Sequence, residues 1–170
     1  MSAPLVSIRV GVVVDRIKAD SPWVDYLWRP SAVLPDAPEM PAWTALKTDG
    51  DTTTFYGGPA QIDLFRTETG NYRDNLATGT PLLWVILRAT ESRPPYAVFA
   101  VTADPAEGEA YTEAGNDLVD SVVMPEEIRR LVADFVAEHH VERGFTKRRR
   151  DRQDPQALAR RGPMRGSGGG

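Results

Sequence analysis

Apolar residues occupy every second position near the start of the chain: Val6, Ile8, Val10, Val12 and Val14. This period of two predicts a strand over residues 5–15 with one buried face. Shorter strands are expected over residues 26–34, 43–47, 52–56 and 62–66, where β-branched and aromatic residues gather between turn residues. Pro30 cannot donate a ladder hydrogen bond, which favours an edge strand or a bulge there. The short connections favour antiparallel pairing, since parallel strands need long crossovers.

Continuous apolar runs over residues 82–88 and 96–102 predict two central strands covered on both faces. A helix is expected over residues 68–77. A second helix is expected over residues 104–114, because Asp104 can act as its N-cap and Gly115 as its stop. The last helix begins near Pro125, and its apolar residues predict a single buried stripe: Ile128, Leu131, Val132, Phe135 and Val136.

This order of elements predicts an α+β fold. We expect a mainly antiparallel sheet of about six to seven strands covered by two or three helices. The length of 170 residues suits one domain, which we place over residues 1–146. The basic remainder, residues 147–170, is expected to be a disordered tail, because it holds few apolar residues and ends in Gly-Ser-Gly-Gly-Gly.

Charge separates these two parts. The net charge of −4 divides into +6 on residues 147–170 and −10 on residues 1–146. The tail either keeps the protein soluble or binds an acidic partner, and the residues that would do so are Lys147, Arg148, Arg149 and Arg150. Specific nucleic-acid binding is not expected, because the body is acidic and no aromatic residue interleaves with the arginines.

The composition excludes several kinds of chemistry. The chain contains no cysteine, so disulfides, thiolate metal sites and thiol nucleophiles are ruled out. It contains no glycine-rich phosphate-binding loop and no serine nucleophile elbow. The longest apolar run is too short to span a bilayer, and no secretory signal is found at the N-terminus. We therefore expect a cytoplasmic protein without membrane contact, and we assign no catalytic residue and no cofactor.

A metal site in this chain would depend on its two histidines. His139 and His140 are adjacent on the last predicted helix, so their side chains diverge by about 100° and cannot reach one ion. No metal site is expected. They either pack at the negative end of the helix, take part in proton transfer or contact a partner.

Two other clusters are candidate binding residues. The first contains Trp23, Asp25, Trp28 and Arg29. It could form a stacked, charge-assisted recognition surface, or the tryptophans could be core anchors beside a local ion pair. The second contains Glu68, Tyr72 and Asn75, whose spacing places them on one helical face. That face either binds a ligand or is solvated with one aromatic ring turned inward.

Four segments together resemble a bacterial family of small proteins that is described only as a domain of unknown function. They are residues 11–16, 23–34, 68–76 and 135–150, and the resemblance extends over about residues 8–150. It implies an accessory protein encoded beside molybdenum-dependent formate dehydrogenases. Some members are labelled as a molybdenum-cofactor guanylyltransferase. We reject that label for this chain, because no glycine-rich nucleotide loop follows the first strand.

The sequence and the resemblance lead to one main functional hypothesis. We expect a non-enzymatic accessory protein that assists maturation or assembly of a molybdenum-dependent formate dehydrogenase by protein–protein contact. The alternative is a binder or enzyme of molybdopterin or nucleotide cofactor biosynthesis, with Trp28 stacked on the ring and Arg29 on a phosphate. A third possibility is an adaptor that binds polyanions through its tail. Under the first hypothesis the client is engaged through the Trp23–Arg29 surface, the His139-His140 helix end and the basic tail. One exposed cleft that holds Trp28, Arg29, His139 and His140 would support a functional role for them.

Overall fold

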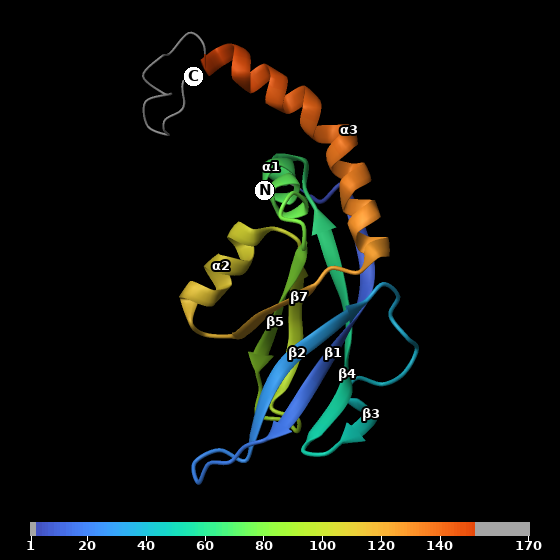
Figure 1. The fold of residues 1–170 in the computed structure, drawn as a ribbon, viewed down its shortest axis with the longest axis vertical. Helices are drawn as coiled ribbons and strands as arrows, with labels where there is room; N and C mark the ends of the chain where they lie inside the picture. Colours follow the sequence, from blue (N-terminus) through green and yellow to red (C-terminus); the bar gives the residue numbers. More distant parts are fainter. Residues whose placement is uncertain (1–2, 152–170) are drawn as a thin grey trace.

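The computed structural model describes residues 3–151, with side chains described for residues 3–140. Figure 1 shows the elements, which are β1 (Val6–Lys18), β2 (Tyr26–Leu34), β3 (Thr44–Asp49), β4 (Thr52–Leu64), a 3-10 turn (Arg66–Glu68), α1 (Thr69–Leu76), β5 (Leu82–Ala89), β6 (Tyr96–Thr102), α2 (Pro105–Ala114), β7 (Leu118–Val123) and α3 (Glu126–Asp151). The described residues form two antiparallel sheets, with strand orders β2-β1-β4-β3 and β6-β5-β7. The expected α+β fold is confirmed, with its seven strands divided between two sheets.

The hydrophobic core lies between these sheets. β4 contacts β6 and β2 contacts β7, so the sheets face each other. The inner face of the larger sheet supplies fully buried residues at alternate positions: Val10, Val12, Val14, Ile62 and Leu64. From the smaller sheet, β5 contributes Leu83, Val85 and Leu87 to the same core. Each such side chain contributes about 1.5–3 kcal/mol by leaving water.

The helices close the core at one end and along one outer face. Tyr72 of α1 and Phe135 of α3 contact each other with ring centroids 6.1 Å apart and belong to the same buried cluster. α2 packs on β5, where Gly108 lies directly against Trp84. The expected caps of α2 are confirmed: the Asp104 carboxylate accepts from the Ala106 N–H at 2.9 Å. Gly115 ends the helix with a left-handed φ of 74°.

β4 differs from its prediction. Residues 52–56 and 62–66 were expected to be two strands separated by a turn at Gly57, Gly58 and Pro59, but one strand runs through them. The glycines form a bulge, since the pairing with β1 shifts between Val12 and Val13. Gly58 has a φ of 131°, and a Cβ at Gly57 would lie 3.1 Å from Val14 and 3.3 Å from Val98. Gly57 therefore lets β4 approach β6 of the other sheet.

The prediction was right for β2 and wrong for β6, for β7 and for one residue of α3. β2 is an edge strand, with Pro30 beside a register shift, as expected. β6 was predicted to be a central strand but lies at an edge, where Phe99 is 46% exposed. Leu131 was expected to share the buried stripe of α3 and is 47% exposed instead. β7 was not predicted, because its short run of mixed residues has no clear period.

The last helix extends further than expected. α3 continues to Asp151, although residues from 147 onward were expected to be disordered. Lys and Arg are good helix formers, which accounts for the continuation. Residues 152–170 of the predicted tail lie outside the described residues. Within the described part of the chain, no helix combines the length and apolar character required to cross a membrane.

Candidate functional site

An open pocket of about 650 Å³ lies at the end of the molecule opposite α1 and α3. It is formed by β1, β2, the connection between them, β4, the residue preceding β3 and the loop between β5 and β6. We call it the aromatic pocket, because four of its lining residues are aromatic: Tyr26, Trp28, Trp43 and Phe55. Its charged lining residues are Arg16, Asp25 and Arg93.

Trp28 is the centre of the aromatic cluster. Its ring stacks on Phe55 at a centroid distance of 6.0 Å and meets Trp43 edge-on at 5.9 Å. Tyr96 from β6 lies 6.1 Å away on the other sheet. Such pairs add about 0.5–1.5 kcal/mol each beyond the burial of their area. Rings from four different segments therefore hold this end of the two sheets together.

Trp43 has a strained backbone at the edge of the pocket. Its φ of 68° lies in the left-handed region, which bulky residues rarely adopt. This conformation costs about 1–2 kcal/mol. The Trp43 N–H donates to the Tyr56 carbonyl, and this bond and the contacts with Trp28 and Phe55 hold the ring in place. Strain of this kind is concentrated at binding sites.

Arg16 lies among these rings. Its guanidinium carbon is 4.3 Å from the Tyr26 ring centroid and 5.2 Å from that of Phe55. Nη2 donates to the Thr53 hydroxyl over 3.5 Å, and Nε is buried without a hydrogen-bond partner. Among residues 3–140, no carboxylate forms an ion pair with Arg16.

Sequence reasoning did not single out Arg16, although a pattern could have found it. Val10, Val12 and Val14 point into the core, and the same period of two places Arg16 on the inner face. In the pairing of β1 with β2, Arg16 lies opposite Trp28. Trp43, Phe55 and Arg93 reach the pocket from distant segments, and no local pattern indicates their meeting.

The predicted cluster around Trp28 lies only partly in this pocket. Asp25 and Trp28 line it. Trp23, in the connection between β1 and β2, is 89% exposed. Arg29 is not among the lining residues: it follows Trp28 in the strand, so it lies on the other face of β2, opposite Asp15. The ion pair considered for Asp25 and Arg29 is not found in the described part of the chain.

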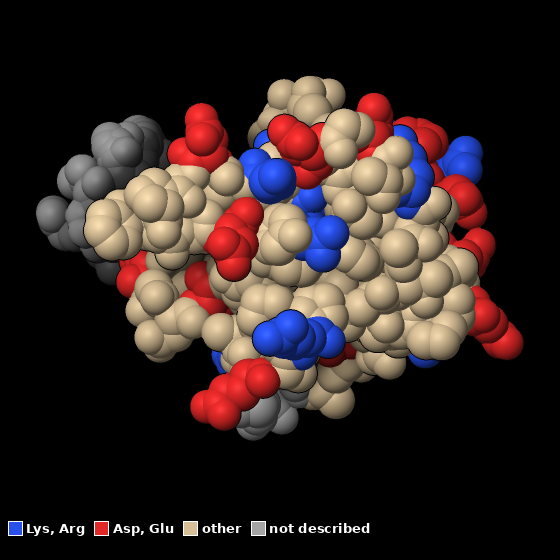
Figure 2. Space-filling model, turned by 90° about the horizontal axis from the view of Figure 1, so that it is seen from below, with Lys and Arg blue, Asp and Glu red and all other residues tan. Residues whose placement is uncertain are grey.

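Basic side chains gather on this end of the molecule. Figure 2 shows Lys and Arg near the centre of the face, with Asp and Glu more often toward its edges. The pocket contributes two cations and one carboxylate to this surface. The local charge therefore differs from the net −10 of residues 1–146.

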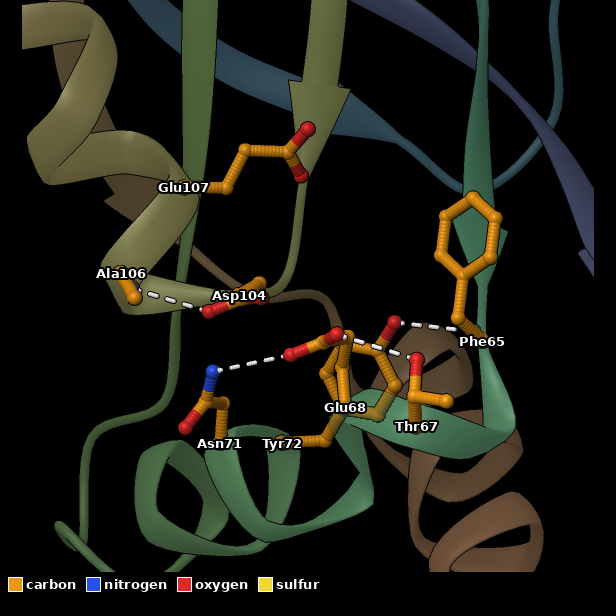
Figure 3. A pocket seen from close by; sticks show the side chains of 8 residues that line it. All are labelled: Phe65, Thr67, Glu68, Asn71, Tyr72, Asp104, Ala106 and Glu107. Atoms are coloured by element: carbon orange, nitrogen blue, oxygen red, sulfur yellow. Dashed lines mark hydrogen bonds between the residues drawn. The ribbon is translucent and has the colours of Figure 1, made fainter. Parts of the chain in front are cut away.

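A second, acidic pocket of about 470 Å³ lies between the starts of α1 and α2. Figure 3 shows three carboxylates around it: Glu68 directly precedes α1, Asp104 directly precedes α2, and Glu107 lies in the first turn of α2. Glu68 accepts hydrogen bonds from the Thr67 hydroxyl at 3.0 Å and the Asn71 amide at 3.3 Å. Among the residues with described side chains, no group of His, Asp and Glu is arranged to hold a metal ion.

Tyr72 is buried beside this acidic pocket. Its hydroxyl oxygen accepts from the Phe65 N–H at 2.9 Å. Burial raises the pKa of Tyr72 to about 12; the Phe65 bond lowers it, and the charges of Asp104, Glu68 and Glu107 raise it further. The phenol therefore stays protonated at neutral pH.

Two residues of the predicted face, Glu68 and Tyr72, lie at one pocket, whereas Asn75 does not line it. Glu68 precedes the first residue of α1 and lines the acidic pocket with Tyr72. Asn75 is buried and donates to the Leu82 and Ala103 carbonyls at 2.8 and 3.0 Å. It also accepts from the Leu82 N–H at 3.0 Å. Asn75 thus ties α1 to the strands that follow.

The histidines belong to the packing of α1 on α3. His140 Nδ1 and the Thr69 hydroxyl are 3.0 Å apart. The His139 ring lies 4.6 Å from that of Phe135. This contact lies on α3, which packs on α1 at the end of the molecule away from the aromatic pocket (Figure 1), so Trp28, Arg29, His139 and His140 do not converge on one cleft. The side chains of Lys147, Arg148, Arg149 and Arg150 lie outside the described residues.

A family model described as a protein of unknown function, DUF3305, matches residues 9–149. The chain belongs to this family. The match begins in β1 and ends near the end of α3, so it includes both pockets and all the described helices. Comparison with curated proteins and with solved structures gave no match.

Proposed function

We propose that this protein is an accessory protein that works by docking another protein at its aromatic pocket. The observation that carries the proposal is the continuity of that pocket with an exposed apolar tip between β1 and β2. Trp23 at this tip is almost fully exposed, and Val24, which also lines the pocket, is about half exposed. Exposed aromatic residues beside a pocket are typical of the central contacts of protein interfaces.

The client that we propose is a molybdenum-dependent formate dehydrogenase during maturation or assembly. This choice rests on the sequence resemblance and on no feature of the pocket. The geometry favours protein docking over the stacking of a pterin or nucleotide ring, because the Trp28 ring already contacts three other rings. A planar ligand stacked on Trp28 would compete with these ring contacts.

Affinity capture of formate dehydrogenase subunits tests the proposal. We compare the tagged wild type with the Trp23→Ala and Leu131→Ala variants. Leu131 is an exposed apolar residue on α3, away from the pocket, which makes it a matched control. The wild type and Leu131→Ala should recover the subunits equally, whereas Trp23→Ala should recover about tenfold less, because an exposed Trp is a typical hot spot.

Two results would contradict this function. One is a wild type that captures no dehydrogenase subunit while deletion of its gene leaves formate oxidation intact. The other is native mass spectrometry that finds a pterin or nucleotide on the isolated protein, which would favour the role in cofactor biosynthesis.

A further inference from the structure

We infer that the aromatic pocket receives an acidic side chain of its protein partner, flanked by apolar residues, and that Arg16 pairs with its carboxylate. This inference rests on the proposed docking function and specifies the chemistry of the docked segment. The first argument is the incomplete bonding of Arg16. A guanidinium has five N–H donors, and this one makes a single long hydrogen bond to Thr53 within the described residues.

The second argument is the orientation of the guanidinium. Tyr26 and Phe55 hold it by cation–π contacts, and Trp28 lies 6.0 Å away. Contact with ring faces orients the cation but leaves its N–H donors without acceptors. A carboxylate is the protein side chain that matches the paired donors of arginine.

The third argument is charge complementarity within the pocket. The pocket is lined by two cations, Arg16 and Arg93, and by one carboxylate, Asp25. Neither arginine forms an ion pair among the described residues. Figure 2 shows basic side chains near the centre of this face. The aromatic rings and Pro94 offer apolar surface beside the cations. An acidic residue between apolar neighbours therefore suits both parts of the pocket.

Two matched peptides test the inference on the full chain. We use acetyl-Phe-Glu-Phe-amide and acetyl-Phe-Gln-Phe-amide, which differ only in the charge of the central residue. The indole N–H resonances of the four tryptophans report the site: Trp28 and Trp43 line the pocket, whereas Trp84 lies against α2 and serves as the internal control. The Glu peptide should shift Trp28 and Trp43 without shifting Trp84. Its Kd should be about tenfold lower than that of the Gln peptide.

Three variants test whether Arg16 causes the preference for the Glu peptide. Arg16→Gln should abolish the difference between the two peptides, and Arg16→Lys should retain part of it because the charge remains. Arg29→Gln makes the same change on the other face of β2, so it should leave the difference intact. An unchanged Trp84 resonance verifies that each variant is folded.

The outcomes separate this inference from the proposed function. Equal affinity of the two peptides for the wild type overturns the preference for an acidic residue and leaves docking standing. A preference that survives in Arg16→Gln overturns the role of Arg16. No shift of Trp28 or Trp43 with either peptide overturns the inference and also argues against docking at this pocket.

Discussion

Arg16 illustrates how one residue changes the character of a strand. β1 places Val10, Val12 and Val14 in the core, and the next inward position carries a cation. An apolar residue there would complete the core and close this end of the sheets. The guanidinium instead lies on aromatic rings and keeps hydrogen-bonding capacity that the described residues do not use. The single cation of Arg16 thus places hydrogen-bond donors in an otherwise aromatic pocket at the end of the core.

Tyr72 provides a prediction at the same scale. Its pKa is about 12 in the folded protein and about 10 in the unfolded chain. Below pH 10 the phenol is protonated in both states, so its contribution to stability is complete. As the pH rises from about 10 to about 12, the unfolded chain loses the proton first, and the free energy of unfolding falls.

Urea unfolding of the wild type and Tyr72→Phe checks this prediction. Between about pH 9 and about pH 11.5, the free energy of unfolding of the wild type should fall by about 1–2 kcal/mol more than that of the variant. The subtraction removes the titration of all other groups. Parallel curves for the two proteins would mean that Tyr72 ionises as easily in the folded state as in the unfolded chain.

At the scale of elements, the packing of α2 on β5 depends on a glycine. A Cβ on Gly108 would lie 2.4 Å from the Trp84 ring, closer than any real contact. In α1, a Cβ on Gly70 would meet only the His140 ring at 3.8 Å, an ordinary distance. The same residue type therefore has a packing role in one helix and none in the other.

The two glycine-to-alanine variants are expected to change the free energy of unfolding differently. Alanine favours a helix by up to about 1 kcal/mol over glycine. Gly108→Ala should nevertheless destabilise the protein by about 1–3 kcal/mol, since α2 must move off Trp84. Gly70→Ala should be neutral or slightly stabilising. Thermal unfolding followed by circular dichroism measures both, and a stabilised Gly108→Ala variant would show that α2 shifts without cost.

At the scale of the whole molecule, the two ends have different roles. One end is closed by α1 and α3, where His140 meets Thr69 and Phe135 meets Tyr72. The other end is open and carries the aromatic pocket and the exposed Trp23. Among residues 3–140, whose side chains are described, the buried hydrophobic cluster extends from Ile8 to Val136 and so precedes the basic segment that begins at Lys147.

This arrangement predicts the effect of shortening the chain. A chain that ends at Asp151 should unfold at the same urea concentration as the full chain, with a free energy within about 0.5 kcal/mol, because no residue of the buried cluster is removed. A chain that ends at Met124 lacks α3 and should not fold. A large loss of stability in the longer chain would show that residues 152–170 contribute to the core.

Features that depend on neighbouring residues follow from the amino-acid sequence alone. Alternation predicted β1, and the Asp104 cap and Gly115 stop set both ends of α2, because hydrophobic period and capping act within a few residues. The α+β class followed from the order of such elements. The acidic body and basic tail likewise follow from composition alone.

Which of these residues come into contact depends on the packing of the two sheets. Whether Gly57 and Gly58 form a turn or a bulge depended on the sheet that packs against them. Trp28 reaches Trp43, Phe55 and Tyr96 across two sheets, while its sequence neighbour Arg29 lies on the other face. Strand register and sheet packing join residues far apart in the chain, and no local period encodes that choice. The pocket is therefore a property of the fold, although every one of its residues is visible in the sequence.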